Sequence, residues 1–157
     1  MEFDINKLKK EYEKYENKYS LPSFEKLNED FEIGKIDKDV GAFLRSVRKT
    51  MMEKIINSLG FVEMFLNPMN VPRIYLPYLK TMDMEDKKII EKLYNVLSEL
   101  SLLSLEREIR YSEKGEAELI KKVFNSWNEL KNDIDNIIKN IKNPKIDYGK
   151  KERSYFG

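Results

Sequence analysis

Residues 112–144 read SEKGEAELIKKVFNSWNELKNDIDNIIKNIKNP, and their apolar side chains recur every three or four residues more regularly than anywhere else in the chain. This spacing places them on one face of an α-helix. Ser112 is a favourable N-cap, and Glu113 and Glu116 suit the positive end of the helix. Asn143-Pro144 ends the pattern. The apolar stripe consists of Ile120, Val123, Trp127, Leu130, Ile134, Ile137 and Ile141.

The sequence predicts two further long helices upstream. One spans about residues 39–66, and its apolar arc is wide enough to place it at the centre of the domain. Its stripe consists of Val40, Leu44, Val47, Met51, Ile55, Leu59, Val62 and Phe65. The other begins at Asp83. Its buried side consists of Ile89, Leu93, Val96, Leu97, Leu100 and Leu103. From Leu105 to Tyr111 the pattern weakens, and the segment is either helical or extended.

Shorter helices are expected around these three. Residues 4–19 carry a tyrosine-rich stripe, which is less apolar than a leucine stripe and predicts a peripheral helix. Ser23 can cap a short helix that ends near Gly34 in the left-handed conformation. Another short helix fits residues 72–80. Gly60, inside the long helix of residues 39–66, either kinks that helix or lets another backbone come close.

These elements together predict an all-α fold. We expect an antiparallel bundle of three long helices with two or three shorter peripheral helices. A chain of 157 residues fits one domain. We expect residues 1–144 to form this domain and residues 145–157 to be a mobile C-terminal tail, because the tail has too few apolar residues to form a core.

The chain contains neither cysteine nor histidine. The absence of cysteine excludes disulfides, thiolate metal sites and cysteine nucleophiles, and it fits a reducing compartment such as the cytoplasm. Without histidine, serine triads, zinc hydrolase sites and helical di-iron sites each lack a necessary base or ligand. We therefore assign no catalytic residue and no metal ligand, and we expect no cofactor.

Charge is high but balanced, with 29 basic residues against 28 acidic residues. The chain as a whole therefore lacks the basic excess that is typical of nucleic-acid-binding domains. The N-terminal residues do not resemble a signal peptide. Charged or polar residues interrupt every apolar run well before the roughly 18 residues that a membrane span needs, so we expect no membrane association.

Two arginines fall on apolar helix faces. Arg48 lies inside the apolar arc of residues 39–66, and Arg107 lies on the stripe of its own helix if that helix continues past Ser104. A buried guanidinium needs a partner, because removing it from water costs several kcal/mol. Each arginine therefore pairs with a carboxylate or reaches solvent, or the two share a pocket that binds a phosphate or carboxylate. The candidate carboxylates are Glu63, Glu106 and Glu108.

Acidic residues could in principle hold Mg²⁺. Asp83, Glu85 and Asp86 form a run at the start of a long helix, where carboxylates are favoured by the helix dipole alone. All-α nucleotide pyrophosphohydrolases hold Mg²⁺ with several inward carboxylates on facing helices. Here the pairs at helical spacing flank the apolar stripes of short outer helices. These pairs are Glu13 with Glu16 and Glu25 with Glu29.

Aromatic side chains suggest two contact surfaces. Tyr12, Tyr15 and Tyr19 form a candidate interaction surface if the first helix stands partly free of the bundle. In the tail, Tyr155 and Phe156 follow four basic and two acidic residues, a mixture that could stack on single-stranded nucleic acid or dock in a groove of a protein.

The function predicted from these features is a non-catalytic helical interaction module that binds a protein partner or a second copy of itself. One alternative is a Mg²⁺-dependent phosphohydrolase, which an inward cluster of three or more carboxylates would favour. A second alternative is a nucleic-acid accessory protein that uses its basic and aromatic tail.

Overall fold

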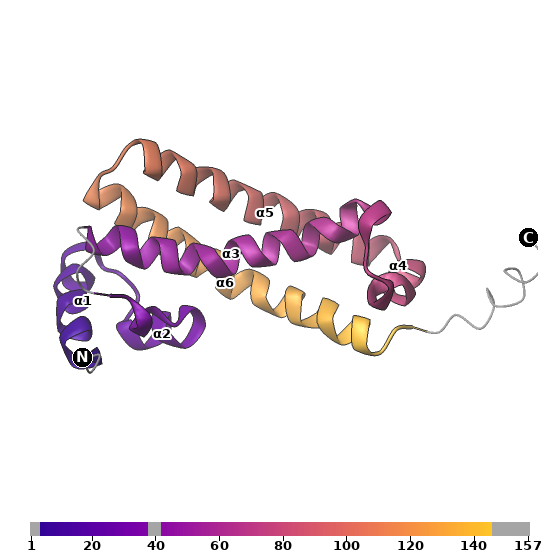
Figure 1. Cartoon of the computed structure of the whole chain (residues 1–157), viewed down its shortest axis with the longest axis horizontal. Helices are drawn as coiled ribbons and strands as arrows, with labels where there is room; N and C mark the ends of the chain where they lie inside the picture. Colours follow the sequence, from indigo (N-terminus) through magenta and orange to yellow (C-terminus); the bar gives the residue numbers. More distant parts are fainter. Residues whose placement is uncertain (1–3, 38–41, 146–157) are drawn as a thin grey trace, which may run out of the picture.

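Three long helices form the body of the molecule in the computed structural model, which describes residues 4–37 and 42–145 (Figure 1). They are α3 (Phe43–Leu66), α5 (Met84–Ile109) and α6 (Glu113–Lys142), and all three pack against one another. The described residues contain helices and no strand. This architecture confirms the predicted bundle of long helices with shorter peripheral ones.

The ends of α5 and α6 follow their capping residues. At the start of α5, Asp83 accepts a hydrogen bond from the Asp86 amide at 2.8 Å, and Asp86 accepts one from the Asp83 amide at 3.1 Å. Ser112 caps α6, because its Oγ accepts a hydrogen bond from the Gly115 amide at 3.0 Å. The ambiguous segment is helical as far as Ile109, so the connection from α5 to α6 is a tight one.

The core lies between the three long helices and matches the predicted apolar faces. The side chains that the sequence places at the centre of each stripe are all buried. They are Leu44, Val47, Met51 and Ile55 of α3, Leu93, Leu97 and Leu100 of α5, and Trp127, Leu130 and Ile134 of α6. They belong to one continuous cluster of buried side chains, as expected for a single hydrophobic core.

One end of the bundle is covered by α1 (Ile5–Tyr19), α2 (Phe24–Phe31) and the short 3₁₀-helix η1 (Ile33–Lys35), with α1 lying across the long helices (Figure 1). Asp4 caps α1 and Ser23 caps α2. Leu8 and Leu27 are fully buried, so these helices extend the core.

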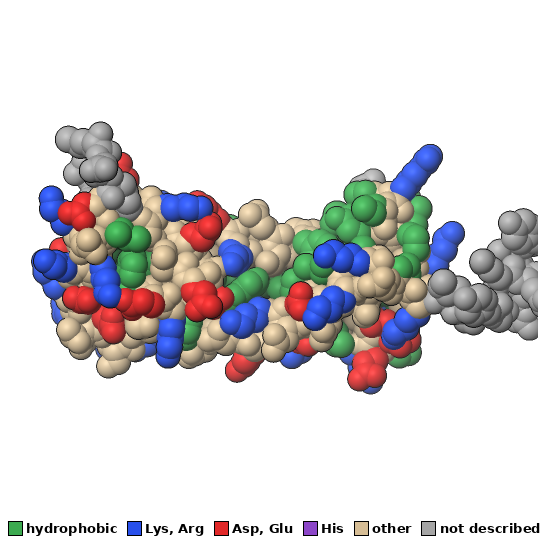
Figure 2. All heavy atoms as spheres, turned by 90° about the horizontal axis from the view of Figure 1, so that it is seen from below, with side chains coloured by type: hydrophobic (Ala, Val, Ile, Leu, Met, Phe, Trp, Pro, Cys, Tyr) green, Lys and Arg blue, Asp and Glu red, His purple; other side chains and the backbone are tan. Residues whose placement is uncertain are grey.

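The other end is built from η2 (Pro68–Asn70), η3 (Arg73–Tyr75) and α4 (Leu76–Thr81). Four aromatic rings hold this end against α3. Their centroids lie 5.2–6.1 Å apart, mostly in edge-to-face geometry. They are Phe61, Phe65, Tyr75 and Tyr78. Hydrophobic side chains also gather on the outer surface of this end (Figure 2).

The expected role of Gly34 is wrong, and of the two alternatives for Gly60 the close approach of a backbone is wrong. Glu32, not Gly34, takes the left-handed conformation after α2, with φ of 54°. Gly34 is required for space, since an added Cβ would lie 2.8 Å from Oδ1 of Asn28, which accepts a hydrogen bond from the Gly34 amide. At Gly60, no atom beyond its own stretch of helix lies within 4 Å of such a Cβ, so no other backbone approaches it. A kink at Gly60 stays a prediction.

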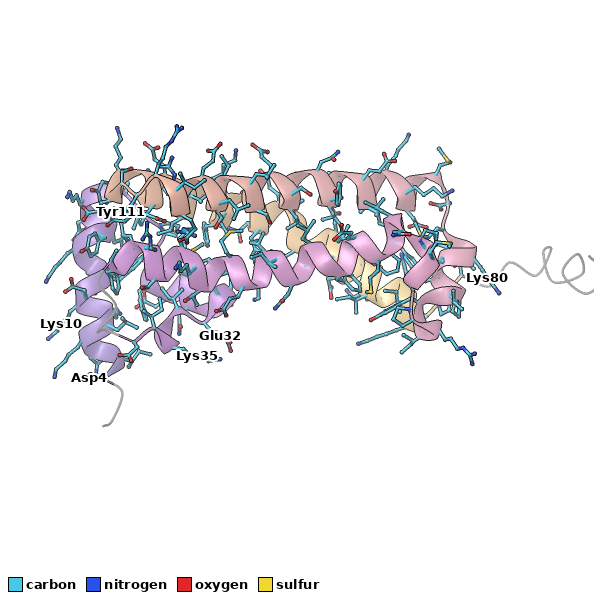
Figure 3. The ribbon with its side chains drawn as sticks, turned by 45° about the horizontal axis from the view of Figure 1, so that its top comes forward. Asp4, Lys10, Glu32, Lys35, Lys80 and Tyr111 are labelled. Carbon is cyan, nitrogen blue, oxygen red and sulfur yellow. The ribbon has the colours of Figure 1, made fainter. Side chains whose placement is uncertain are left out.

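The two ends of the bundle are far apart along its long axis. Figure 3 shows Tyr111, Lys10 and Asp4 at the end covered by α1, spread along that helix, and Lys80 at the opposite end, with α5 as one long edge between the two ends. The predicted helix start at Asp39 lies outside the described residues. Within residues 4–37 and 42–145, no helix is long and apolar enough to cross a membrane.

Candidate functional site

Arg48 is at the centre of a buried polar network between the three long helices. Its guanidinium donates from Nε to Glu116 Oε2 at 2.7 Å and from Nη2 to Glu116 Oε1 at 3.2 Å. Nη2 also donates to Glu108 Oε1 at 2.9 Å, and Nη1 donates to Ser104 Oγ at 2.8 Å. Each long helix therefore contributes a group to this network.

The network places two opposite charges in an apolar interior. Arg48 is 1% exposed and Glu116 is fully buried. Burial alone lowers the pKa of the Arg48 guanidinium, but its hydrogen bonds with Glu116 and Glu108 outweigh burial and leave that pKa above its ordinary value. The hydrogen bond from Arg48 in turn holds the pKa of the Glu108 carboxyl below its usual range.

Of the alternatives open for Arg48, the structure shows the ion pair. Glu108 was among the expected partners, whereas Glu63 and Glu106 do not contact Arg48 among the described hydrogen bonds and ion pairs. The main partner, Glu116, was assigned to the helix dipole instead. The spacing nevertheless indicates that Glu116 faces inward, because Glu116 precedes Ile120 by four residues and continues the apolar stripe of α6.

Arg107 does not share the Arg48 network. Its Nη1 donates to Ser112 Oγ at 3.4 Å, and its guanidinium lies over Gly115, where an added Cβ would be 1.9 Å from Nη1. The backbone carbonyl of Arg107 accepts a hydrogen bond from Arg45 at 3.4 Å. The two arginines therefore do not combine into one anion pocket.

Of the three tyrosines expected to form a contact surface on α1, Tyr12 is buried in the molecule, and Tyr15 and Tyr19 are half-buried. A partner contact at Tyr15 and Tyr19 stays a prediction. Tyr12 is fully buried and donates a hydrogen bond to the Pro22 carbonyl at 2.5 Å. Tyr15 stacks on Phe43 with 5.5 Å between ring centroids, and the Tyr19 hydroxyl donates to Glu113 at 2.6 Å. Burying these aromatic rings against the bundle is more favourable than leaving them in water, and this stabilises the packing of α1. Tyr155 and Phe156 lie outside the described residues.

The acidic residues considered for Mg²⁺ lie outside the Arg48 network, at the start of α5 and on the surface of the short helices. Asp83 and Asp86 form the capping box of α5, and Lys145 lies 3.2 Å from Asp83. Glu25 is paired with Lys9 at the surface. In the part of the chain that the structure describes, no three acidic side chains come together as a metal site.

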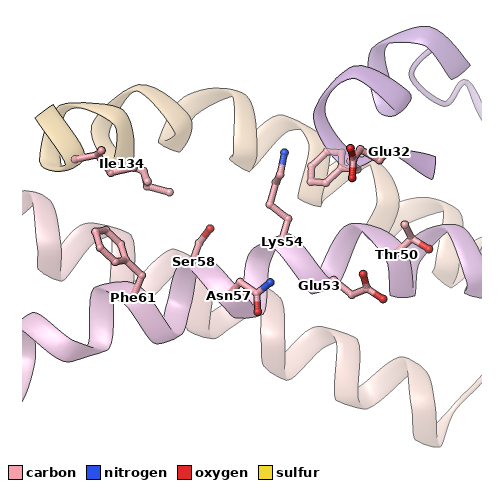
Figure 4. A pocket seen from close by; sticks show the side chains of 10 residues that line it. Glu32, Thr50, Glu53, Lys54, Asn57, Ser58, Phe61 and Ile134 are labelled. Carbon is pink, nitrogen blue, oxygen red and sulfur yellow. The ribbon is translucent and has the colours of Figure 1, made fainter. Parts of the chain in front are cut away.

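A groove of about 390 Å³ lies between α3 and α6, bordered by the end of α2. Figure 4 shows Lys54 projecting from α3 across the groove, between Glu32 on one side and Ile134 on the other. The Lys54 ammonium donates to the Asp30 carbonyl and lies 5.3 Å from the centroid of the Trp127 ring. Lys54 therefore connects α3 to α2 and α6, which is a structural role.

The surface around the η2–α4 end carries exposed apolar side chains. Met69 is 88% exposed and Ile74 is 71% exposed, and Leu66 and Leu76 lie beside them in the chain with exposed side chains. We call these four residues the apolar cap. The sequence predicts a short helix at residues 72–80 and no binding surface there. The missed signal was the composition of residues 64–82, which contain no aspartate or glutamate in a chain with 36% charged residues.

Comparison of the chain with models of known families, with curated proteins and with solved structures gave no match. These comparisons assign the chain to no family. The proposed function therefore rests on the arrangement of the protein's side chains alone.

Proposed function

We propose that this protein is a helical interaction module that binds another protein through the apolar cap. The observation that carries the proposal is the exposure of Leu66, Met69, Ile74 and Leu76 at one end of a bundle whose surface is otherwise rich in charge. Contiguous exposed apolar side chains are typical of binding surfaces, whereas singly scattered ones are ordinary.

The composition of the cap favours a protein as the partner. The centres of protein–protein interfaces are depleted of lysine and acidic residues and enriched in methionine, aromatic residues and arginine. Met69 of the cap and the neighbouring Arg73 are exposed, and residues 64–82 contain no acidic residue. The flexible side chain of Met69 can also adjust its shape to a partner.

The support beneath the cap is rigid, which lowers the entropy cost of binding. The cluster of Phe61, Phe65, Tyr75 and Tyr78 lies under the cap and fixes η3 and α4 on α3. Tyr78 is almost completely buried there. The exposed side chains therefore project from a backbone that is already held in place.

The experiment compares three forms of the full chain in affinity capture from the native lysate, followed by binding measurements with the purified partner. The cap variant carries Met69→Glu and Ile74→Glu. The matched control carries Ile56→Glu, because Ile56 is an exposed apolar residue of α3 outside the cap. All three forms should unfold at similar temperatures, since the substituted side chains contribute little to the core.

We expect one partner to be retained by the wild type and by Ile56→Glu and to be lost from the cap variant. Its affinity for the cap variant should fall at least about tenfold, because two charges would have to be buried in the interface. Equal retention of every captured protein by all three forms would show that the cap is not the binding surface.

A further inference from the structure

The described chain leaves the bundle at the end that carries the apolar cap. Lys145 is the last described residue, and its Nζ lies 3.2 Å from Asp83 Oδ2 at the start of α5. α4, which begins with Leu76 of the cap, ends two residues before Asp83 and packs against α6 (Figure 1). Met84 is 69% exposed beside Asp83 in the chain. Residues 146–157 therefore continue from a point beside exposed apolar side chains.

The cap lies within the reach of residues 146–157. The six residues of α4 and the connection to Asp83 keep Leu76 within about 30 Å of Lys145, even if every segment lies in line. Ten residues of extended chain reach about 33 Å, so residue 155 can lie on the cap. Ile109, the other strongly exposed end of α5, is much farther away, at about 39 Å from Asp83 along the helix.

Residues 146–157 supply apolar side chains that fit such a surface. Large aromatic residues are rare in segments that stay in water, so the adjacent pair Tyr155 and Phe156 indicates a contact. The segment holds three basic and two acidic residues, so apolar contact and not net charge selects its binding surface. Its apolar residues are Ile146, Tyr148, Tyr155 and Phe156.

We propose that residues 146–157 pack on the apolar cap of the same molecule and compete there with the protein partner. A segment tethered this closely acts at an effective concentration in the millimolar range, so weak apolar contacts are enough to cover the cap. The partner then binds only the fraction of molecules whose cap is open, which lowers its apparent affinity. The competition rests on the proposed function, whereas the packing of the segment on the cap does not.

Cross-linking in the full chain tests the packing, because the chain has no cysteine. Arg73→Cys beside the cap is combined with Ser154→Cys, and neither substitution removes an apolar side chain of the contact. The matched controls combine Ser154→Cys with Asn57→Cys, in the groove between α3 and α6, or with Ile109→Cys. Under mild oxidation of dilute protein, the intramolecular disulfide should form at least about tenfold faster at the cap than in either control. Equal rates for the three pairs would overturn the proposal.

The same disulfide reports whether the aromatic pair makes the contact. Replacing Tyr155 and Phe156 by Ser gives the segment variant. In the pair of Arg73→Cys with Ser154→Cys, these replacements should lower the rate of disulfide formation to that of the Asn57→Cys control, because only random encounters remain. A rate that stays high would overturn the proposed contact.

A labelled peptide with the sequence of residues 146–157 gives a second measurement, by fluorescence anisotropy with the full chain. The peptide should bind the segment variant at least about tenfold more tightly than the wild type, whose own segment occupies the cap. Adding Met69→Glu and Ile74→Glu to the segment variant should abolish this binding. Equal binding by the wild type and the segment variant would contradict the intramolecular contact.

Capture from the lysate separates this inference from the proposed function. We expect the segment variant to retain more of the cap-dependent partner than the wild type. If both retain it equally and no disulfide forms preferentially at the cap, this inference fails and the proposed function stands. If the disulfide forms preferentially at the cap but no captured protein depends on the cap, the packing of the segment stands and the proposed function fails.

Discussion

At the scale of single residues, Arg48 and Glu116 carry the largest electrostatic cost in the fold. Both are buried, and their hydrogen bonds at 2.7 and 3.2 Å offset the loss of hydration. Because most donors of Arg48 are occupied by Glu116, Glu108 and Ser104, the guanidinium holds the three long helices in register and has little capacity left for an external anion.

Replacing Arg48 by Ala should destabilise the protein by about 3–5 kcal/mol, because Glu116 would remain buried as an unpaired charge. Arg48→Met combined with Glu116→Gln should recover most of this loss, since the interior then holds no charge at this position. The measurement is the free energy of unfolding by denaturant at neutral pH. A double variant as unstable as Arg48→Ala would contradict the ion-pair explanation. Phosphate added at constant ionic strength should leave the wild-type melting temperature unchanged.

Tyr78 should make stability sensitive to alkaline pH. Burial, together with the nearby Asp86 and Asp83, raises the pKa of Tyr78 to about 12 from an ordinary value of about 10. A raised pKa means that the folded state binds the proton more tightly, so the stabilisation is complete below about pH 10 and is lost as the pH rises toward 12. Tyr78→Phe should reduce this alkaline loss, measured by unfolding at several pH values from 8 to about 12.

The matched control for Tyr78 is Tyr12. Within the described residues the Tyr78 hydroxyl has no hydrogen-bond partner, so Tyr78→Phe should change stability little at neutral pH. The Tyr12 hydroxyl donates to Pro22, so Tyr12→Phe should cost about 1 kcal/mol at the same pH. If the two substitutions reduced stability equally, the Tyr78 hydroxyl would have to form a hydrogen bond with a group other than the described residues.

At the scale of elements, each long helix depends on local chemistry at its ends and on packing along its length. Ser112→Ala should destabilise the protein by about 1 kcal/mol, because it removes the acceptor for the Gly115 amide at the start of α6. The control is Ser101→Ala inside α5, where the hydroxyl only donates back to the Leu97 carbonyl and should contribute little. Thermal unfolding of both variants gives the comparison, and equal effects would contradict the capping role.

The elements also show where periodicity is informative. α6 has one apolar stripe and a polar remainder, so its inward face follows from the sequence alone. α5 has apolar residues on both sides; spacing places Leu97 on the buried side and Leu102 on the opposite side, where Leu102 is exposed. Spacing therefore predicts the buried face of α5, but it does not show that the apolar side chains on the opposite face stay exposed.

At the scale of the whole molecule, a single core joins the three long helices. Leu97→Ala and Leu130→Ala should each cost about 2–5 kcal/mol, because both side chains are buried at the centre of the bundle. Leu102→Ala, on the exposed face of α5, should change stability by about 0.5 kcal/mol or less. Denaturant unfolding of the three variants tests this packing, and losses below about 1 kcal/mol at both core positions would contradict it.

The sequence by itself determined the three long helices apart from the last residues of α5, where α5 and α6 begin, and which face of α6 is buried. Capping, helix-ending prolines and apolar spacing act over a few residues, so they can be read without knowing the neighbours. The same local information showed that Arg48 needs a partner, because its position on an apolar face does not depend on how the helices are arranged.

Only the tertiary structure decided which residues meet. Glu116 lies 68 residues from Arg48, and their contact depends on the register in which α3 packs against α6. Tyr12 is buried because α1 lies on the bundle, while Met69, Ile74 and Ile109 are exposed because no described element covers them. Exposure is a property of the surrounding elements, since an apolar side chain is removed from water only by what packs against it.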